Sequence, residues 1–149
     1  MRFMLIRKAD ENTEAGVLPD ENLIAAMGQY NEELVNAGIM LAGEGLQPSA
    51  KGARVKFSKG KPSVTDGPFS ETKELIAGFT MIEVGSKEEA IEWVKRWPAL
   101  DGNGEVEIEI RKVFEASDFG AEFTPELREA EERMREHILK SGKKLGEKA

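Results

Sequence analysis

Two segments of the chain are apolar on both faces of a predicted strand, residues 2–7 and residues 76–84. In the first, Phe3 and Leu5 point one way, and the alternate positions, also apolar, point the other way. A strand without a polar face belongs in the middle of a sheet, covered on both sides. We therefore expect both segments to be central strands.

Two helices are predicted from apolar positions that recur every three or four residues. The first begins at Pro19-Asp20-Glu21 and stops at Gly38, which tolerates the left-handed conformation of a helix end. The second begins at Ser86, where Glu89 predicts a capping box, and Pro98 ends it. The apolar stripes are Leu23, Met27, Tyr30 and Leu34 in the first helix, and Ala90, Ile91, Val94 and Trp97 in the second.

Shorter patterns predict three further elements. Ile39-Met40-Leu41-Ala42 forms a strand that runs into Gly43-Glu44-Gly45-Leu46, where glycines let the backbone bend or approach another group closely. A hairpin is centred on Lys59-Gly60-Lys61, and Pro62 marks an exposed edge. In residues 105–110 the aliphatic side chains alternate with glutamates, which predicts a last strand with one buried and one solvent-exposed face.

This order of elements predicts an α+β fold, a ferredoxin-like sandwich with an inserted β-hairpin. Two helices cover only one face of such a sheet, yet its central strands are apolar on both. The second face therefore needs a cover. We expect a homodimer in which two sheets pack face to face, as in a dimeric α/β barrel.

Past Val113 the composition changes, which divides the chain into a domain of residues 1–113 and an extension of residues 114–149. Thr124-Pro125-Glu126 begins an extra C-terminal helix rich in charged residues. Its thin apolar stripe suggests a helix laid over the body or over a partner. Lys143 to Ala149 is expected to be a frayed end. The stripe consists of Leu127, Ala130, Met134 and Ile138.

Composition narrows the classes of function. The chain of 149 residues has a net charge of -7, a sequence pI near 5.0 and no cysteine. An acidic chain without a dense basic cluster is a poor partner for nucleic acid or anionic lipid. Disulfides and thiolate metal sites are excluded. The apolar run Phe3-Met4-Leu5-Ile6 is too short for a signal peptide or a membrane span, so we expect a cytoplasmic protein.

The densest group of polar side chains lies at a glycine-proline turn in residues 64–74, VTDGPFSETKE. One interpretation is structural, with Asp66 capping the turn and Phe69 filling the core. The other places Asp66 or Glu71 in a partly dry cleft, where desolvation would raise a carboxyl pKa toward that of a general acid or base. Lys73 would then polarise a substrate oxygen or hold a carboxylate.

Other residues complete the candidate site. Glu44, between two glycines at a strand end, is a second candidate carboxyl group. Tyr30 lies on a buried stripe. Its hydroxyl is therefore expected either to form a hydrogen bond within the protein or to contact a substrate. Arg111 either binds an anionic group of a ligand or forms an ion pair at the surface. His137, the sole histidine, lies in the charged C-terminal helix, and we predict no metal and no cofactor. The catalytic candidates are Asp66, Glu44 and Lys73, and the ligand-binding candidates are Phe69, Glu71, Thr72, Tyr30 and Arg111.

Three segments resemble one family. They are Gly43 to Pro48, the run VTDGPFSETKE from Val64 to Glu74, and Gly78 to Val84 followed by a helix containing Glu92-Trp93. Together they resemble the DGPF branch of the YCII-related proteins, over about Met1 to Val113. The resemblance implies a ferredoxin-like fold that forms dimeric α/β barrels.

The resemblance implies less about activity. YCII relatives include a dehydrochlorinase that acts on a chlorinated hydroxyquinol, and some carry a histidine paired with an aspartate as a proposed catalytic dyad. No histidine lies in residues 1–113, so this dyad does not transfer. Genes for DGPF proteins often lie beside sigma factors of the extracytoplasmic-function type. Two hypotheses follow: a small-molecule pocket with lyase or isomerase chemistry, and a non-catalytic regulatory module.

Overall fold

The computed structural model describes residues 1–142 of the chain. Its contacts divide the chain into two compact units, Met1–Lys112 and Val113–Ala149. Each unit is described by itself.

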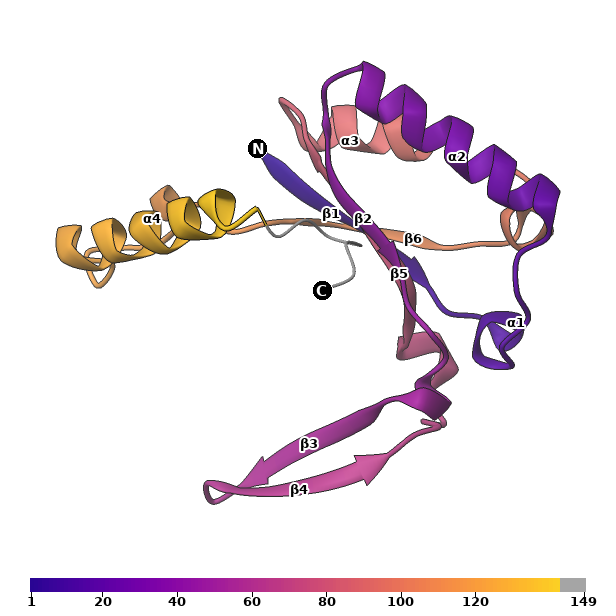
Figure 1. Cartoon of the computed structure of the whole chain (residues 1–149), viewed down its shortest axis with the longest axis horizontal. Coiled ribbons are helices and arrows are strands. Elements are labelled where there is room, and N and C mark those ends of the chain that lie inside the picture. Colours follow the sequence, from indigo (N-terminus) through magenta and orange to yellow (C-terminus); the bar gives the residue numbers. More distant parts are fainter. Residues whose placement is uncertain (143–149) are drawn as a thin grey trace. The chain divides into compact units, whose positions relative to one another are not determined.

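The first unit is built on a four-stranded antiparallel sheet with the strand order β2-β5-β1-β6. The strands are β1 (Arg2–Lys8), β2 (Met40–Gly45), β5 (Ile76–Glu83) and β6 (Ile108–Lys112). The helices α2 (Glu21–Asn36) and α3 (Lys87–Val94) lie on the same face of this sheet (Figure 1). This is the ferredoxin-like arrangement. β1 and β5 are the central strands, as their double-sided apolar pattern predicts.

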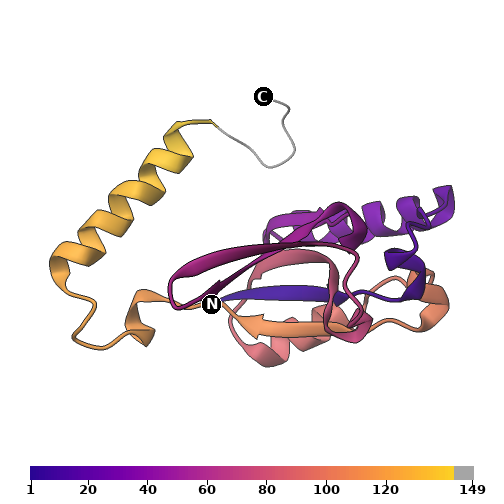
Figure 2. The same cartoon turned by 90° about the horizontal axis from the view of Figure 1, so that it is seen from below.

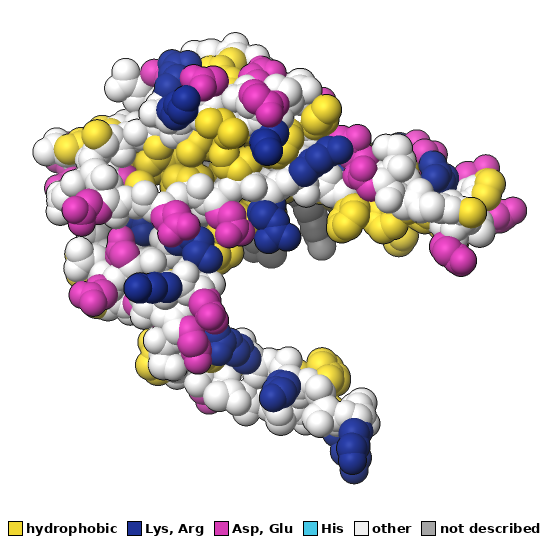
Figure 3. All heavy atoms as spheres, turned by 180° about the vertical axis from the view of Figure 1, so that it is seen from behind, with side chains coloured by type: hydrophobic (Ala, Val, Ile, Leu, Met, Phe, Trp, Pro, Cys, Tyr) yellow, Lys and Arg dark blue, Asp and Glu magenta, His cyan; other side chains and the backbone are white. Residues whose placement is uncertain are grey.

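The strand register explains the core. On β1, Phe3 and Leu5 lie on the helix-covered face, opposite Ile82 and Thr80 of β5. Tyr30 and the other buried side chains of the helices pack onto them. The buried hydrophobic core consists of Phe3, Leu5, Tyr30, Leu34, Ile82, Val84 and Ala90. Seen from behind, hydrophobic side chains also reach the surface between the helices and the adjoining edge of the sheet (Figure 3).

The other face of the sheet carries a second apolar strip. Met4 lies opposite Met81, and Ile6 lies opposite Phe79, so these four side chains share one face across the two central strands. All four are only half-buried. Figure 2 looks at this face, and α2 and α3 lie beyond the sheet in that view.

The inserted hairpin forms as predicted, from β3 (Ala53–Ser58) and β4 (Lys61–Asp66). It projects away from the four-stranded sheet (Figure 1), and every residue of both strands is exposed. The turn uses positive φ angles at Lys59 and Gly60. Val55 pairs with Val64, and Phe57 pairs with Pro62, so one side of the hairpin is apolar.

Several predicted boundaries were wrong. β2 runs from Met40 through Gly45, past its predicted end at Ala42, because Gly43 and Gly45 pair with Thr80 and Gly78 of β5. α3 ends at Val94 rather than near Pro98, and its predicted capping box is incomplete, because the Glu89 carboxylate accepts from Gly85 N–H. Val106 lies outside β6.

The connecting segments contain short helices that the sequence pattern did not predict. The residues of the loop after β1 include a four-residue helix, because Asp10 and Thr13 cap each other reciprocally. The others are single turns of 3-10 helix. These elements are α1 (Glu11–Glu14), η1 (Ser49–Lys51), η2 (Thr72–Glu74), η3 (Asp101–Gly104) and η4 (Ala116–Asp118).

The second unit contains α4 (Pro125–Lys140), which begins at the predicted cap, since the Thr124 side chain accepts from Leu127 N–H. None of its residues is buried. Leu127, Met134 and Ile138 of the predicted stripe are 53%, 60% and 62% exposed. The predicted frayed end, residues 143–149, lies outside the described residues.

Tyr30 offers a spectroscopic check of the core, because it is the only tyrosine in the chain. Its ring is 3% exposed and its hydroxyl donates to the carbonyl oxygen of Trp93 at 2.8 Å. Burial raises the pKa of Tyr30 to about 12. An ultraviolet absorbance titration of the native protein should therefore show one phenolate transition near that pH rather than near 10.

The same shift has a consequence for stability. Because the folded pKa lies above the unfolded value, the stabilisation from neutral Tyr30 is complete below about pH 10 and is lost as the pH rises toward the folded pKa. The substitution Tyr30→Phe should remove the absorbance transition and reduce the free energy of unfolding by about 1 kcal/mol, since it removes one hydrogen bond to the Trp93 carbonyl oxygen, which keeps its bond from Arg96 N–H. A transition near pH 10 in folded protein would contradict this packing.

Candidate functional site

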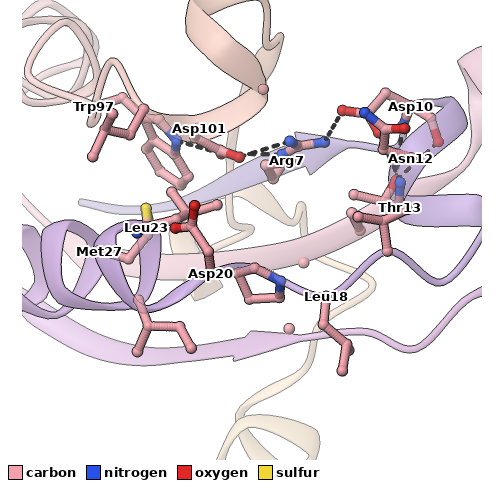
Figure 4. Close-up of a pocket in the computed structure, with 18 of the residues that line it drawn as sticks. Arg7, Asp10, Asn12, Thr13, Leu18, Asp20, Leu23, Met27, Trp97 and Asp101 are labelled. Carbon is pink, nitrogen blue, oxygen red and sulfur yellow. Dashed lines mark hydrogen bonds and ion pairs between the residues drawn. The ribbon is translucent and has the colours of Figure 1, made fainter.

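A pocket of the first unit lies between α2 and the helix-covered face of the sheet, and no residue of the glycine-proline turn lines it. Its volume is about 950 Å³, at the upper end of the range of small-molecule sites. Leu23 and Met27 of α2 form an apolar wall, and Trp97 adds an aromatic side chain from the segment after α3. Figure 4 shows how these residues lie around Arg7 and Asp101.

Glycines leave the space that this pocket occupies. Gly43, Gly45 and Gly78 contribute to its lining from β2 and β5. The strands approach closely here, since a Cβ atom on Gly78 would lie 2.9 Å from the Glu44 carbonyl oxygen. Gly28 is different. It lies inside α2, and a Cβ atom there would meet no atom within 4 Å.

A buried ion pair forms one end of the pocket (Figure 4). The guanidinium of Arg7 donates from Nε and Nη2 to the two carboxylate oxygens of Asp101, at 3.2 and 2.8 Å. Its Nη1 donates to Asp10 at 3.1 Å and to the carbonyl oxygen of Lys8 at 2.8 Å. Trp97 Nε1 donates to Asp101 at 2.9 Å. The side chains of Arg7 and Asp101 are each 10% exposed.

The network fixes the charge states of its members. Burial by itself disfavours the charged guanidinium, but the hydrogen bonds and charges of Asp101 and Asp10 outweigh it and raise the pKa of Arg7. Partial burial opposes ionisation of Asp10 as well, yet its bonds from Thr13 N–H and Arg7 lower its pKa. The stability from Asp10 is therefore present above its unfolded pKa, near 4, and is lost as the pH falls.

Local sequence explains how these groups meet. Arg7 follows Phe3 and Leu5 on the helix-covered face of β1, so its side chain enters the protein. Asp101 begins η3, where Gly102 takes a positive φ angle of 59°. A Cβ atom on Gly102 would lie 2.6 Å from Val106 Cγ1, so the turn that presents Asp101 needs glycine on two grounds.

The structure does not bring the three catalytic candidates together in this pocket. Glu44 contributes to its lining, but Glu44 pairs with Phe79 in the sheet register, which places its side chain on the other face. Asp66 ends β4 and Lys73 lies in η2, and both are exposed and outside the lining. Their joint acid–base role stays a prediction.

The glycine-proline turn has a packing role. A Cβ atom on Gly67 would lie 1.7 Å from the Ser49 carbonyl oxygen, so only glycine fits. Phe69 N–H donates to Ser49 Oγ at 3.0 Å, and the Phe69 ring lies under the guanidinium of Arg54, 3.9 Å from its centroid. Arg54 also pairs with Glu71 at 3.3 Å. Phe69 is half-buried beneath Arg54 and is not among the residues of the core.

The remaining ligand-binding candidates lie apart from the pocket. Tyr30 is buried, with its hydroxyl bonded to Trp93. Arg111 is exposed on β6, with a 3.5 Å contact to Glu109, and Thr72 is half-buried in η2. None of the three contributes to the lining. His137 is exposed in α4.

Sequence reasoning missed Arg7, Asp10, Trp97 and Asp101. A signal for Arg7 was present, because strict alternation on β1 places it on the same face as Phe3 and Leu5. A buried arginine requires a carboxylate partner. No local pattern pointed to Asp101, which lies 94 residues away in the chain.

Two absences hold for residues 1–142. No group of three or more His, Cys, Asp or Glu side chains there is arranged to hold a metal ion. None of the helices in that range has the length and hydrophobicity that a membrane span requires.

Comparisons with known proteins agree with the fold. Residues 1–117 match the YCII-related domain. An uncharacterised protein of Rhizobium meliloti (strain 1021) is 33% identical over 76 residues, which cover 51% of this chain and 61% of that protein. The aligned part thus spans about three-fifths of the length of the curated relative.

One solved structure is also similar. It is 5-chloro-2-hydroxyhydroquinone dehydrochlorinase from Burkholderia phenoliruptrix AC1100, in complex with 2,5-dihydroxybenzoquinone. It aligns with a TM-score of 0.43 and 16% identity, over 80% of this chain and 100% of that chain. So distant an alignment says nothing about the chemistry of this chain. The family match covers most of the sequence, and the chain belongs to the YCII-related family.

The Arg7–Asp101 pair should be a main source of stability at the pocket. The substitution Asp101→Asn keeps the side-chain shape but leaves the buried guanidinium with one carboxylate fewer, so we expect a loss of about 3 kcal/mol in urea unfolding. The substitution Glu92→Gln is a control, because it breaks the exposed Lys95–Glu92 pair and should cost less than about 1 kcal/mol. Equal losses in both variants would contradict the structural role of the network.

Proposed function

We propose that the pocket between α2 and the sheet binds a small organic molecule. The observation that carries this proposal is the space itself, about 950 Å³ lined by both apolar walls and a buried charged network. Ligand sites combine these features, because apolar surface supplies affinity and a few fixed polar groups supply orientation.

Gly28 strengthens the proposal. Glycine inside a helix costs about 0.8–1 kcal/mol relative to alanine. Gly28 is exposed, and no atom outside its own stretch of α2 lies within 4 Å of the position where its Cβ would be. Contacts within the chain therefore do not explain a glycine at this position, whereas a ligand against α2 would.

The chemistry of any reaction is a further step of the proposal. Carboxylates near a bound molecule suit proton transfer, the basis of lyase and isomerase reactions. Asp10 and Asp101 are the carboxylates that the network holds at one end of the pocket. They replace Asp66 and Lys73 as the groups we would test first, because neither of those two lines the pocket.

A substitution that fills the pocket tests the binding proposal. In Gly28→Leu the new side chain should occupy the open space, and the better helix propensity of leucine should maintain stability. A screen of small aromatic molecules by protein-observed NMR should give ligands that shift pocket resonances of the native chain. Their affinity should fall at least tenfold in Gly28→Leu.

The control is Gln29→Leu, which adds the same side chain one residue further along α2, at a position outside the lining of this pocket. It should leave binding unchanged. If no ligand binds the native chain in the pocket, or if ligands bind Gly28→Leu as tightly as the native chain, the proposal is wrong.

We also propose that two copies pair through the uncovered sheet face. The support is the half-buried strip of Met4, Ile6, Phe79 and Met81, which α2 and α3 leave uncovered. Burial of such a strip is favourable by about 25 cal/mol per Å² of apolar surface. The homodimer expected from the sequence would use this face.

Sedimentation equilibrium tests the pairing. The native chain should be a dimer at micromolar concentration, and Met81→Arg should shift it toward monomer because a charge would be buried in the contact. The control Val35→Arg changes an apolar side chain that is 59% exposed on α2, on the other side of the sheet, and should leave the dimer intact. A native monomer would refute the dimer.

The regulatory alternative would use the second unit. Its support is the exposed apolar stripe of α4, including Met134 and Ile138. No described residue identifies what would cover that stripe. A role beside a sigma factor therefore stays a prediction from the family resemblance.

A further inference from the structure

We infer that the pocket selects a neutral or cationic molecule that presents hydrogen-bond donors on an apolar body, and that it rejects carboxylates and phosphates. This inference rests on the proposed binding function and specifies its ligand class. It follows from the way in which the charged side chains around the pocket are already bonded to one another.

The positive charge at the pocket is already compensated. Among the residues that the structure shows lining it, Arg7 is the one basic side chain. A guanidinium has five N–H donors, and four of those of Arg7 are bonded to Asp101, Asp10 and the Lys8 carbonyl. The fifth N–H could give an anionic ligand one bond, but a bidentate contact with Arg7 would require displacing a buried carboxylate and leaving it uncompensated.

Negative charge remains available. Asp10, Asp20 and Asp101 contribute three carboxylates to the lining, against the single guanidinium. Each carboxylate can accept about four hydrogen bonds. Asp101 accepts three, whereas Asp20 accepts one from Leu23 N–H at 2.8 Å. Asp20 therefore keeps acceptor capacity at the start of α2, on the side of the pocket where Leu23 lies (Figure 4).

The remaining surface suits the apolar body of the ligand. Leu18, Leu23, Met27 and Trp97 contribute apolar side chains around the same space (Figure 4). A ring system with a hydroxyl or amine substituent can contact these side chains and donate to a carboxylate. The same ring with a carboxylate would place like charges together, which costs affinity.

Three probes with one ring system separate charge from shape: 1-naphthylmethylamine, 1-naphthalenemethanol and 1-naphthoate. Dissociation constants are measured by protein-observed NMR on the full chain at pH 7 and at two salt concentrations. The amine and the alcohol should bind, and the carboxylate should bind at least about tenfold more weakly than the alcohol. Added salt should weaken the amine and leave the alcohol unchanged.

Asp20→Asn tests the position of the charge. Asparagine caps a helix as well as aspartate does, so the variant should keep the fold. It should reduce the affinity of the amine about two- to fivefold, with no effect on the alcohol. Glu21→Gln is the matched control, because it removes the same charge from the next residue, which does not line the pocket. It should leave both affinities unchanged.

The outcomes distinguish the inference from the proposed function. If the carboxylate binds as tightly as the alcohol or more tightly, the ligand class is wrong while binding in the pocket stands. If Glu21→Gln and Asp20→Asn weaken the amine equally, the selection reflects overall charge and the inference is also wrong. If no probe binds the pocket, the inference falls, and the wider NMR screen then decides the proposed function on its own.

Discussion

The first unit depends on one buried charge, the guanidinium of Arg7. The face of β1 that carries Phe3 and Leu5 continues to Arg7, so a cation enters a layer whose other end is filled by apolar side chains. Such a charge is tolerated only with compensation. Asp101 and Asp10 supply it, and both come from connecting segments, so the ion pairs also hold α1 and η3 against the sheet.

The charged network around Arg7 also marks the boundary between the pocket and the hydrophobic core. At the end of the sheet where Phe3, Ile82 and Leu34 pack, side chains fill the space between sheet and helices. At the Arg7 end, Gly43, Gly45 and Gly78 lie on the strands, and the space stays open. A polar network at one end and missing side chains on the strands therefore leave an open pocket beside a core that is close-packed.

The sequence predicted the fold better than the site, for a physical reason. Periodicity is a local signal, so β1, β5, α2 and the hairpin were found where the apolar pattern lies. The Arg7–Asp101 pair joins residues 94 positions apart, and local patterns hold no information about such contacts. The polar density at residues 64–74 has at least one packing cause that the sequence did not reveal, because Gly67 is needed there for its approach to Ser49.

Family membership limits the function without selecting it. The YCII-related match covers residues 1–117, the part of the chain that forms the sheet and the pocket. Within residues 1–142, the lining of the pocket holds no histidine, lysine or tyrosine, so proton transfer there would depend on its carboxylates. Asp101 is buried, and both of its carboxylate oxygens accept hydrogen bonds, three in all, from Arg7 and Trp97. A carboxylate held in that way orients a ligand more readily than it exchanges a proton, so binding stands ahead of catalysis as the role of this pocket.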